Sequence, residues 1–418
     1  MNKKIGNIFK GDKVIWMVFF FLCMISIVEV FSASSGLTYK SQNYVGPIAY
    51  HTFTIFLGVL AAIVTLNVPC RYFKLLTPFL LLLSGLMLLV VMLGGGESTN
   101  DASRWIRLGP FTIQPSEIAK GTIVLTVAQI LAAMQRDKGA DRKAFKYILW
   151  FTIPACMAIG VENLSTAALL FAVVFLMMFI GLVPMRQLGK LFAIIAFIGI
   201  FAISMVMIVG HDRSEEENQQ LAKTEQVEKP QKKSKLEKML HRADTWKARI
   251  MKFGKPKPTP KEYDLDKDAQ VAHANIAIVS SAIVGKGPGK STERDFLAQA
   301  FSDFIFAIVI EELGIIGAAA VVFLYIILLY RCARIASRCE NNFPAFLAMG
   351  LGLLLVIQAT FNMMVAVGLA PVTGQPLPLI SKGGTSTIIN CVYIGAILSV
   401  SRSAKMKKEV QEDKVLKN

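Results

Sequence analysis

The chain has 418 residues, of which 54% are hydrophobic and 18% are charged, and its mean hydropathy is +0.52. This composition is too apolar for a soluble globular protein and predicts an all-α polytopic membrane protein. We expect the formal net charge of +16 to orient the loops and to meet anionic lipid, and we expect no nucleic-acid binding. The six cysteines and four histidines have no spacing that indicates a disulfide framework or a zinc site.

Ten apolar segments are predicted to cross the roughly 30 Å of hydrocarbon in a bilayer. The predicted spans are 14–33, 49–68, 75–94, 116–134, 147–161, 164–182, 189–210, 304–329, 345–370 and 386–401. The first follows a basic start but is too long for the apolar region of a signal peptide, so we expect it to be retained. The fifth is short and joins the sixth through VENLSTA, which leaves open a broken or re-entrant pair.

Lysine and arginine are concentrated in the segments that would lie on one side of the membrane. These basic segments are 1–13, 69–74, 134–146, 183–190, 330–344 and 402–418. The short segments of the opposite side, 34–48, 95–115 and 371–385, contain few basic residues. Positive charge favours the cytoplasmic side, so we expect both termini and the tail 402–418 in the cytoplasm, within one membrane domain over 1–418.

The long segment 211–302 connects the seventh and eighth spans and is expected outside the cytoplasm, because long loops translocate largely regardless of charge. Its first part, 211–235, is polar and mixed in charge, which predicts a flexible insertion. The pattern over 236–253 fits either an amphipathic helix on the outer surface or a partly disordered linker.

The first polar segment near the outer face is 102–120. Pro115 suits the first turn of a helix, and Glu117 and Lys120 are three residues apart, so they can pair on one face. A functional interpretation is that Lys120 lies inside the membrane and faces a cavity and a partner. The simpler interpretation is a well-capped helix start preceded by the interfacial anchors Arg104, Trp105 and Arg107.

The second polar segment, 278–304, is rich in glycine. Its glycines, with Lys286 and Lys290, could let backbone N–H groups approach a phosphate. The stretch GKGPGKST does not match a P-loop, and a plain surface turn is the simpler interpretation.

The third segment, FSDFIFAIVIEELG, places three carboxylates in an apolar stretch. Asp303 lies where the eighth span is predicted to begin, so an N-cap would explain it without any function. Glu311 is eight residues further on, roughly 12 Å along a helix, which is too far for a glycosidase carboxylate pair. We expect Glu311 and Glu312, deeper in the bilayer, to pair with buried cations or to line a cavity.

The fourth segment, 362–386, contains three prolines and three glycines that exclude a continuous helix. Irregular backbone at membrane depth must be enclosed by protein or line a wet cavity.

In this order, the four segments resemble the SEDS family (shape, elongation, division and sporulation). The matching motifs are RWI, QPSE, DFIFA, EELG and PVTGQPLPLIS with GGTS. The DFIFA, EELG and SKGGTS wording is closer to the FtsW division branch than to RodA. The chain departs from the family at VENLSTA, where Glu162 and Asn163 replace a proline and an aspartate, and at Lys382, which replaces a tyrosine.

The resemblance implies a peptidoglycan glycosyltransferase that polymerises lipid II at the outer face of the cytoplasmic membrane, for septal synthesis in cell division. It implies a class B penicillin-binding protein as transpeptidase partner, together with other division proteins and undecaprenyl-linked glycan. Asp303 matches the family's catalytic aspartate, and it would be the general base for the acceptor sugar's 4-hydroxyl.

The resemblance also implies a set of substrate-binding residues. Cations are needed for the lipid pyrophosphate that leaves, and the candidates are Arg104, Arg107 and Lys120, with Lys286 and Lys290 as second choices. A divalent cation, Mg²⁺ or Mn²⁺, is left open. The remaining candidates for substrate contact are Trp105, Glu117, Glu311, Ser381, Gly383 and Gly384.

Three alternatives stay open. A lipid II flippase would use the same intramembrane charges to line a translocation path. A RodA-like polymerase would serve elongation and cell shape in place of division. A scaffold that recruits division proteins would depend on 211–235 or 402–418 more than on the buried charges.

Overall fold

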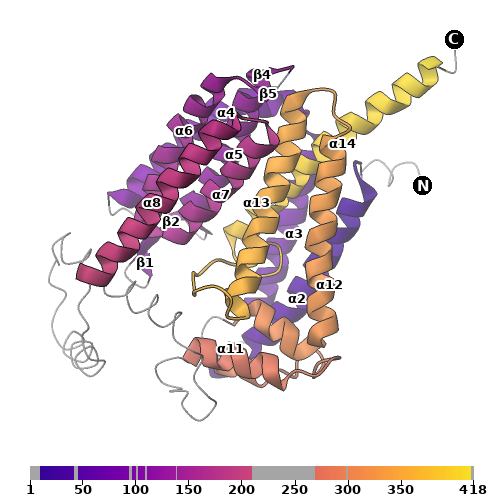
Figure 1. Ribbon diagram of the computed structural model, residues 1–418. Helices are drawn as coiled ribbons and strands as arrows, with labels where there is room; N and C mark the ends of the chain where they lie inside the picture. The colour runs from indigo at the N-terminus through magenta and orange to yellow at the C-terminus, as the bar shows by residue number, and fades with distance from the viewer. Residues whose placement is uncertain are drawn as a thin grey trace. The chain divides into compact units, whose positions relative to one another are not determined.

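The computed structural model describes residues 10–41, 46–93, 97–99, 102–108, 111–137, 139–209, 269–297 and 300–415 (Figure 1). The chain forms two compact units, one made of Met1–Met185 with Asp264–Asn418 and the other of Arg186–Tyr263. The predicted insertion 211–235 lies outside the described residues, and so does 236–253, for which an amphipathic helix and a partly disordered linker were both open.

Each of the ten predicted spans coincides with a helix. These helices are α2 (Lys13–Ser41), α3 (Gly46–Asn67), α4 (Cys70–Met92), α5 (Pro115–Ala133), α6 (Arg142–Glu162), α7 (Leu164–Ile180), α8 (Met185–Val209), α12 (Ile305–Ala336), α13 (Asn342–Ala366) and α14 (Thr385–Val415). Among the described residues, eight of them are long and apolar enough to cross a membrane, namely α2 to α6 and α12 to α14. The apolar helix α7 is shorter, at 17 residues.

Two short helices and five short strands complete the described structure. The helices are α11 (Ala269–Ser280) and the 3-10 helix η1 (Glu293–Asp295). The strands are β1 (Glu97–Thr99), β2 (Ala102–Leu108), β3 (Phe111–Ile113), β4 (Gln135–Arg136) and β5 (Gly139–Ala140), all paired antiparallel. The sequence pattern did not predict these strands, because four of them have only two or three residues and the seven residues of β2 do not alternate strictly between apolar and polar.

The fifth and sixth spans are broken at one residue, which is one of the two possibilities that the sequence left open. Asn163 has extended backbone angles (φ −151°, ψ 93°) and follows the last residue of α6 directly. Its side-chain oxygen accepts a hydrogen bond from the Thr166 N–H at 3.2 Å, which caps α7. Asparagine therefore supplies a helix cap at the position where the SEDS pattern has an aspartate.

Helices α3 and α14 pack closely because small residues face each other. A Cβ atom on Gly395 would lie 2.5 Å from the Ala62 carbonyl oxygen, and one on Gly58 would lie 2.7 Å from the Cys391 Sγ. Such glycines let two helix backbones approach within a membrane protein.

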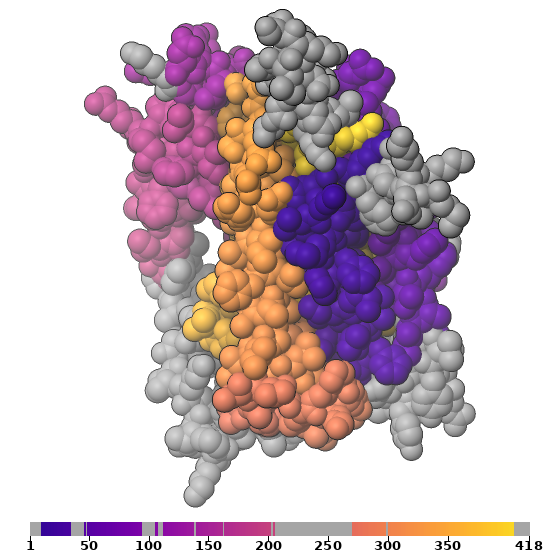
Figure 2. All heavy atoms as spheres, turned by 90° about the vertical axis from the view of Figure 1, so that its right-hand side faces the viewer, coloured from indigo at the N-terminus to yellow at the C-terminus, as the bar shows by residue number. Residues whose placement is uncertain are grey.

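The polar segments gather at one end of the larger unit. The loop between α13 and α14, helix α11 and the first turn of α12 lie at this end, and the start of α2 and the end of α14 lie at the other (Figure 1). Figure 2 shows α11 and the loop after it, in salmon, across the end of α12 and next to α2.

Candidate functional site

Asp303 lies just before α12 and is not its N-cap. The N-cap residue is Phe304, which makes no side-chain capping bond, so the expectation that Asp303 caps this helix is wrong. Because Asp303 precedes the helix, helical spacing does not set its distance from Glu311. The Asp303 side chain is partly exposed, and its Oδ1 accepts a hydrogen bond from the Ser302 hydroxyl at 3.0 Å.

The backbone around Asp303 is bound to the loop between α13 and α14. The Ser381 hydroxyl donates to the Ser302 carbonyl at 2.6 Å, and the Lys382 N–H donates to the Phe301 carbonyl at 2.9 Å. The Lys382 ammonium lies over the Phe301 ring, 5.0 Å from its centroid. Residues 301–303 and 381–382 therefore lie side by side, which brings together the third and fourth segments of the sequence analysis.

Buried amide side chains hold this loop in place. The Asn362 Nδ2 donates to the carbonyls of Asp303 at 2.8 Å and of Gln375 at 2.7 Å. The Gln375 Nε2 donates to the Thr166 hydroxyl at 2.7 Å, and the Gln358 Nε2 donates to the Pro376 carbonyl at 3.1 Å. The backbone N–H and C=O groups of an irregular segment in this enclosed position need such hydrogen-bond partners, because water does not bind them there.

The predicted pairing of Glu117 with Lys120 is confirmed. The two side chains form an ion pair at 2.8 Å, and both are buried. The Lys120 Nζ also donates to the Gln358 Oε1 at 2.7 Å, and the Tyr393 hydroxyl donates to the Glu117 carbonyl at 2.5 Å. Lys120 is thus linked through Gln358 to the loop beside Asp303.

The sequence analysis missed Gln358 and Asn362. These residues are four apart on α13, so they lie on one face of the helix, and both are about 99% buried. Both residues could have been identified from the sequence, because they are polar residues at helical spacing inside an apolar stretch.

The strand that carries RWI adjoins the start of α14. In β2, Trp105 is half-buried and Arg107 is exposed, and the Arg104 side chain lies outside the described part. Strand β3 pairs with β2, and its Thr112 carbonyl accepts a hydrogen bond from the Thr385 hydroxyl at 2.7 Å. The first segment therefore meets the fourth, just after Gly383 and Gly384.

Helix α12 is broken at Gly314, which has φ +70° and ψ −171°. The break frees the carbonyls of Glu311 and Glu312, and these accept hydrogen bonds from the N–H groups of Lys286 at 3.0 Å and of Gly287 at 2.8 Å. Gly285 lies against the break so closely that a Cβ atom there would clash with the Glu312 carbonyl. The glycine-rich segment is therefore docked on α12 by its backbone.

The Glu311 side chain anchors the same loop. Its Oε1 pairs with the Lys286 Nζ at 2.6 Å and accepts from the Thr292 N–H at 3.0 Å. The Lys286 Nζ also donates to the hydroxyls of Ser280 and Thr292, each at 3.0 Å. The expectation that Glu311 pairs with a cation is confirmed, and this cation is already bound three times within the chain.

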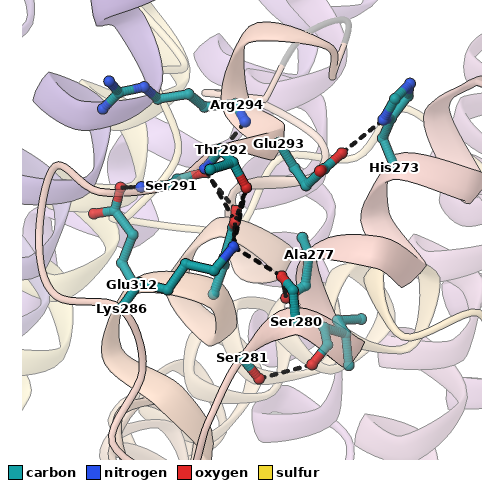
Figure 3. A network of polar contacts seen from close by, with 12 residues as sticks. His273, Ala277, Ser280, Ser281, Lys286, Ser291, Thr292, Glu293, Arg294 and Glu312 are labelled. Carbon is teal, nitrogen blue, oxygen red and sulfur yellow. Dashed lines mark hydrogen bonds and ion pairs between the residues drawn. The ribbon is translucent and has the colours of Figure 1, made fainter.

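Glu312 and His273 complete the anchoring of the loop (Figure 3). The Glu312 carboxylate accepts from the N–H groups of Gly289 at 2.9 Å and of Ser291 at 3.1 Å. His273 on α11 contacts Glu293 on η1 at 2.6 Å. Lys290, predicted as a second choice for substrate, is exposed on this loop.

Within the described ranges, no three His, Cys, Asp or Glu side chains are grouped so that they could hold a metal ion.

The fold and the site define a polytopic helical membrane protein in which a proline- and glycine-rich loop is bound to the segment that ends at a partly exposed aspartate. Residues 12–406 match the family described as "Cell cycle protein", which covers FtsW, RodA and SpoVE, and the chain belongs to this family. The SEDS resemblance drawn from the motifs is thereby confirmed.

Two relatives illustrate the match. The chain is 29% identical over 399 residues to the "Probable peptidoglycan glycosyltransferase FtsW" of Aromatoleum aromaticum, covering 93% of this chain and 87% of the relative. It is 30% identical over 399 residues to the protein of the same name from Geobacter metallireducens, covering 94% and 95%.

Solved structures share the fold. One, described as "Structural coordination of polymerization and crosslinking by a peptidoglycan synthase complex", has a TM-score of 0.67 at 23% identity, covering 94% of this chain and 98% of the other. The rod shape determining protein RodA of Thermus thermophilus has a TM-score of 0.61 at 22% identity, covering 95% and 98%.

Proposed function

We propose that this protein is a peptidoglycan glycosyltransferase that polymerises lipid II, and that it serves septal synthesis. Membership of the family and the names of the relatives support the activity and favour the division role. The observation that carries the proposal is the fixed position of Asp303. Its backbone is held by Asn362, and the adjacent Ser302 carbonyl is held by Ser381, so a partly exposed carboxylate is kept in one place.

Asp303 acts as the general base in this mechanism. It accepts the proton of the acceptor sugar's 4-hydroxyl, and that oxygen forms a bond to the anomeric carbon of the donor sugar. The bond from this carbon to the lipid pyrophosphate breaks, and the pyrophosphate leaves with the electron pair. The Ser302 hydroxyl, which donates to Oδ1, orients the carboxylate for this step.

The other predicted site residues, apart from Lys290, divide into three groups. Arg104 and Arg107 on β2, with Trp105, contact the donor and offset the charge of the leaving pyrophosphate. Ser381, Gly383 and Gly384 shape the loop beside Asp303. Lys120, Glu117, Lys286 and Glu311 act through their ion pairs, which hold these segments together.

The chain spans the cytoplasmic membrane ten times in this proposal, with both termini in the cytoplasm and 211–302 outside. The start of α2 and the end of α14 lie at the end of the larger unit opposite α11, which supports this topology (Figure 1). A class B penicillin-binding protein is the proposed partner, with other division proteins. A structure of the same fold is described as a peptidoglycan synthase complex, which supports this choice.

The test is polymerisation of lipid II by the purified protein with its class B partner. Asp303→Asn should abolish glycan strands while lipid binding persists. Asp295→Asn is the matched control, because its side chain is 52% exposed on the nearby η1, and it should polymerise like the native protein. If Asp303→Asn polymerises normally, Asp303 is not the base. If native protein makes no strands but moves labelled lipid across a bilayer, the protein is a flippase.

A further inference from the structure

Lys382 differs from Lys120 and Lys286 because no described carboxylate neutralises its charge. Lys120 pairs with Glu117, and Lys286 pairs with Glu311. No ion pair joins Lys382 to any carboxylate in the part of the chain that the structure describes, Asp303 included. An ammonium group that is partly removed from water and lacks an anion is unfavourable unless a ligand supplies one.

The position of Lys382 is fixed relative to Asp303. Its N–H binds the Phe301 carbonyl at 2.9 Å, and its ammonium lies 5.0 Å from the centroid of the Phe301 ring. The cation is therefore held against a segment that ends, two residues later, at the proposed base. In the proposed reaction the acceptor oxygen that the base deprotonates and the leaving pyrophosphate are joined to the same anomeric carbon, so a cation is needed close to the base but not in contact with it.

The residues after Lys382 offer further donors to an anion. Helix α14 begins at Thr385, and no hydrogen bond joins the N–H groups of Gly383, Gly384 and Thr385 to other described residues. The first N–H groups of a helix favour negative charge. The Ser386 hydroxyl, which is 98% buried, has no partner among the described groups.

The space beside Gly384 is open. A Cβ atom on Gly384, which has φ +53°, would meet nothing within 4 Å. A tyrosine, the residue of the SEDS pattern at 382, could donate one hydrogen bond but would carry no positive charge.

We propose that Lys382 and the N-terminus of α14 form the binding site for the pyrophosphate group of the lipid-linked donor. This inference rests on the proposed function. Lys382 neutralises the pyrophosphate as it leaves, and the free N–H groups bind its oxygen atoms. Burial lowers the pKa of Lys382, and a bound dianionic group would reverse that effect by stabilising the ammonium.

The test measures binding of undecaprenyl pyrophosphate to the full chain in nanodiscs. Lys382→Met should weaken binding at least tenfold, and Lys382→Arg should keep most of it because the charge remains. Lys146→Met is the control for nonspecific attraction of anionic lipid, because Lys146 is an exposed lysine near the start of α6. This control should bind like the native protein, and thermal unfolding should show that all variants are folded.

Further ligands identify what the site recognises. The binding of undecaprenyl monophosphate and of phosphatidylglycerol should depend on Lys382 much less than the binding of undecaprenyl pyrophosphate does. Inorganic pyrophosphate should compete with undecaprenyl pyrophosphate for the site. Equal dependence for all anionic lipids would overturn the proposal in favour of a general lipid contact. Undiminished binding by Lys382→Met would overturn it outright. Binding does not require turnover, so a Lys382-dependent site in a protein that makes no glycan would contradict only the proposed function.

Discussion

The Lys120 Nζ lies 2.7 Å from the Gln358 Oε1, and this contact joins a buried ion pair on α5 to the loop beside Asp303. Lys120 is 0% exposed, so its charge depends on Glu117 and Gln358 alone among the described residues. Replacing Lys120 by methionine should leave Glu117 charged and buried without its cation.

We expect Lys120→Met to destabilise the protein by about 3–5 kcal/mol, because breaking a buried pair leaves one uncompensated charge. The measurement is denaturant unfolding in detergent. The double variant Glu117→Gln with Lys120→Met should recover part of the loss, since it removes both charges. A double variant as unstable as the sum of the two single variants would show that the pair is not coupled.

Asn362→Leu should slow turnover without removing lipid binding. The amide of Asn362 holds the carbonyls of Asp303 and Gln375, so its loss shifts the proposed base relative to the loop. A misplacement of about 1 Å can reduce a rate on the order of 100-fold. Steady-state kinetics should show the loss in kcat with KM nearly unchanged. Met364→Leu, a partly exposed position on the same helix, should behave like the native protein; a similar loss there would point to general damage of α13.

Gly314→Ala should loosen the segment 281–297 from α12. Gly314 has φ +70°, and a Cβ atom there would clash with the Ile283 carbonyl. The strained backbone alone costs roughly 1–3 kcal/mol. Hydrogen exchange at the amides of Lys286 and Gly287 should become faster. Gly85→Ala on α4, where an added Cβ meets nothing within 4 Å, is the matched control and should leave this exchange unchanged.

Pyrophosphate binding should weaken at alkaline pH before an ordinary lysine would lose its proton. Burial lowers the pKa of Lys382, so its ammonium is present below that pKa and lost as the pH rises through it. An exposed lysine has a pKa of about 10.4, so the loss of pyrophosphate binding is expected at a pH below that value. The charge of Lys382 acts on His51 of α3, and Asp303 lies on the segment that adjoins Lys382. Lys382→Arg should bind equally across the range, and a native profile as flat as that of the arginine variant would exclude Lys382 as the titrating group.

Much of the fold follows from simple sequence rules. Apolar length was enough to find the ten helical segments, and spacing by three was enough to pair Glu117 with Lys120. The break at Gly314 was not predicted, because its partner is the backbone of residues 283–287, about 30 positions earlier in the chain. Local propensity contains no information about such a contact.

The sequence identified the motifs of the candidate site but not the hydrogen bonds that join them. Asp303, Ser381 and the glycines were identified by resemblance, whereas the roles of Gln358, Asn362 and Gln375 depend on packing between three distant segments. The N-cap prediction for Asp303 was wrong because α12 begins one residue later than the apolar pattern suggested.

The contact between Gly285 and Gly314 restricts which residues can replace either glycine during evolution. Each glycine occupies the space in which a side chain on the other residue would have to fit, and the obstructing atoms belong to the main chain. A larger residue at either position cannot be rescued by trimming a neighbouring side chain, because there is none to trim. We therefore expect that random mutagenesis with selection for growth would recover no second-site suppressor of Gly285→Val or Gly314→Val.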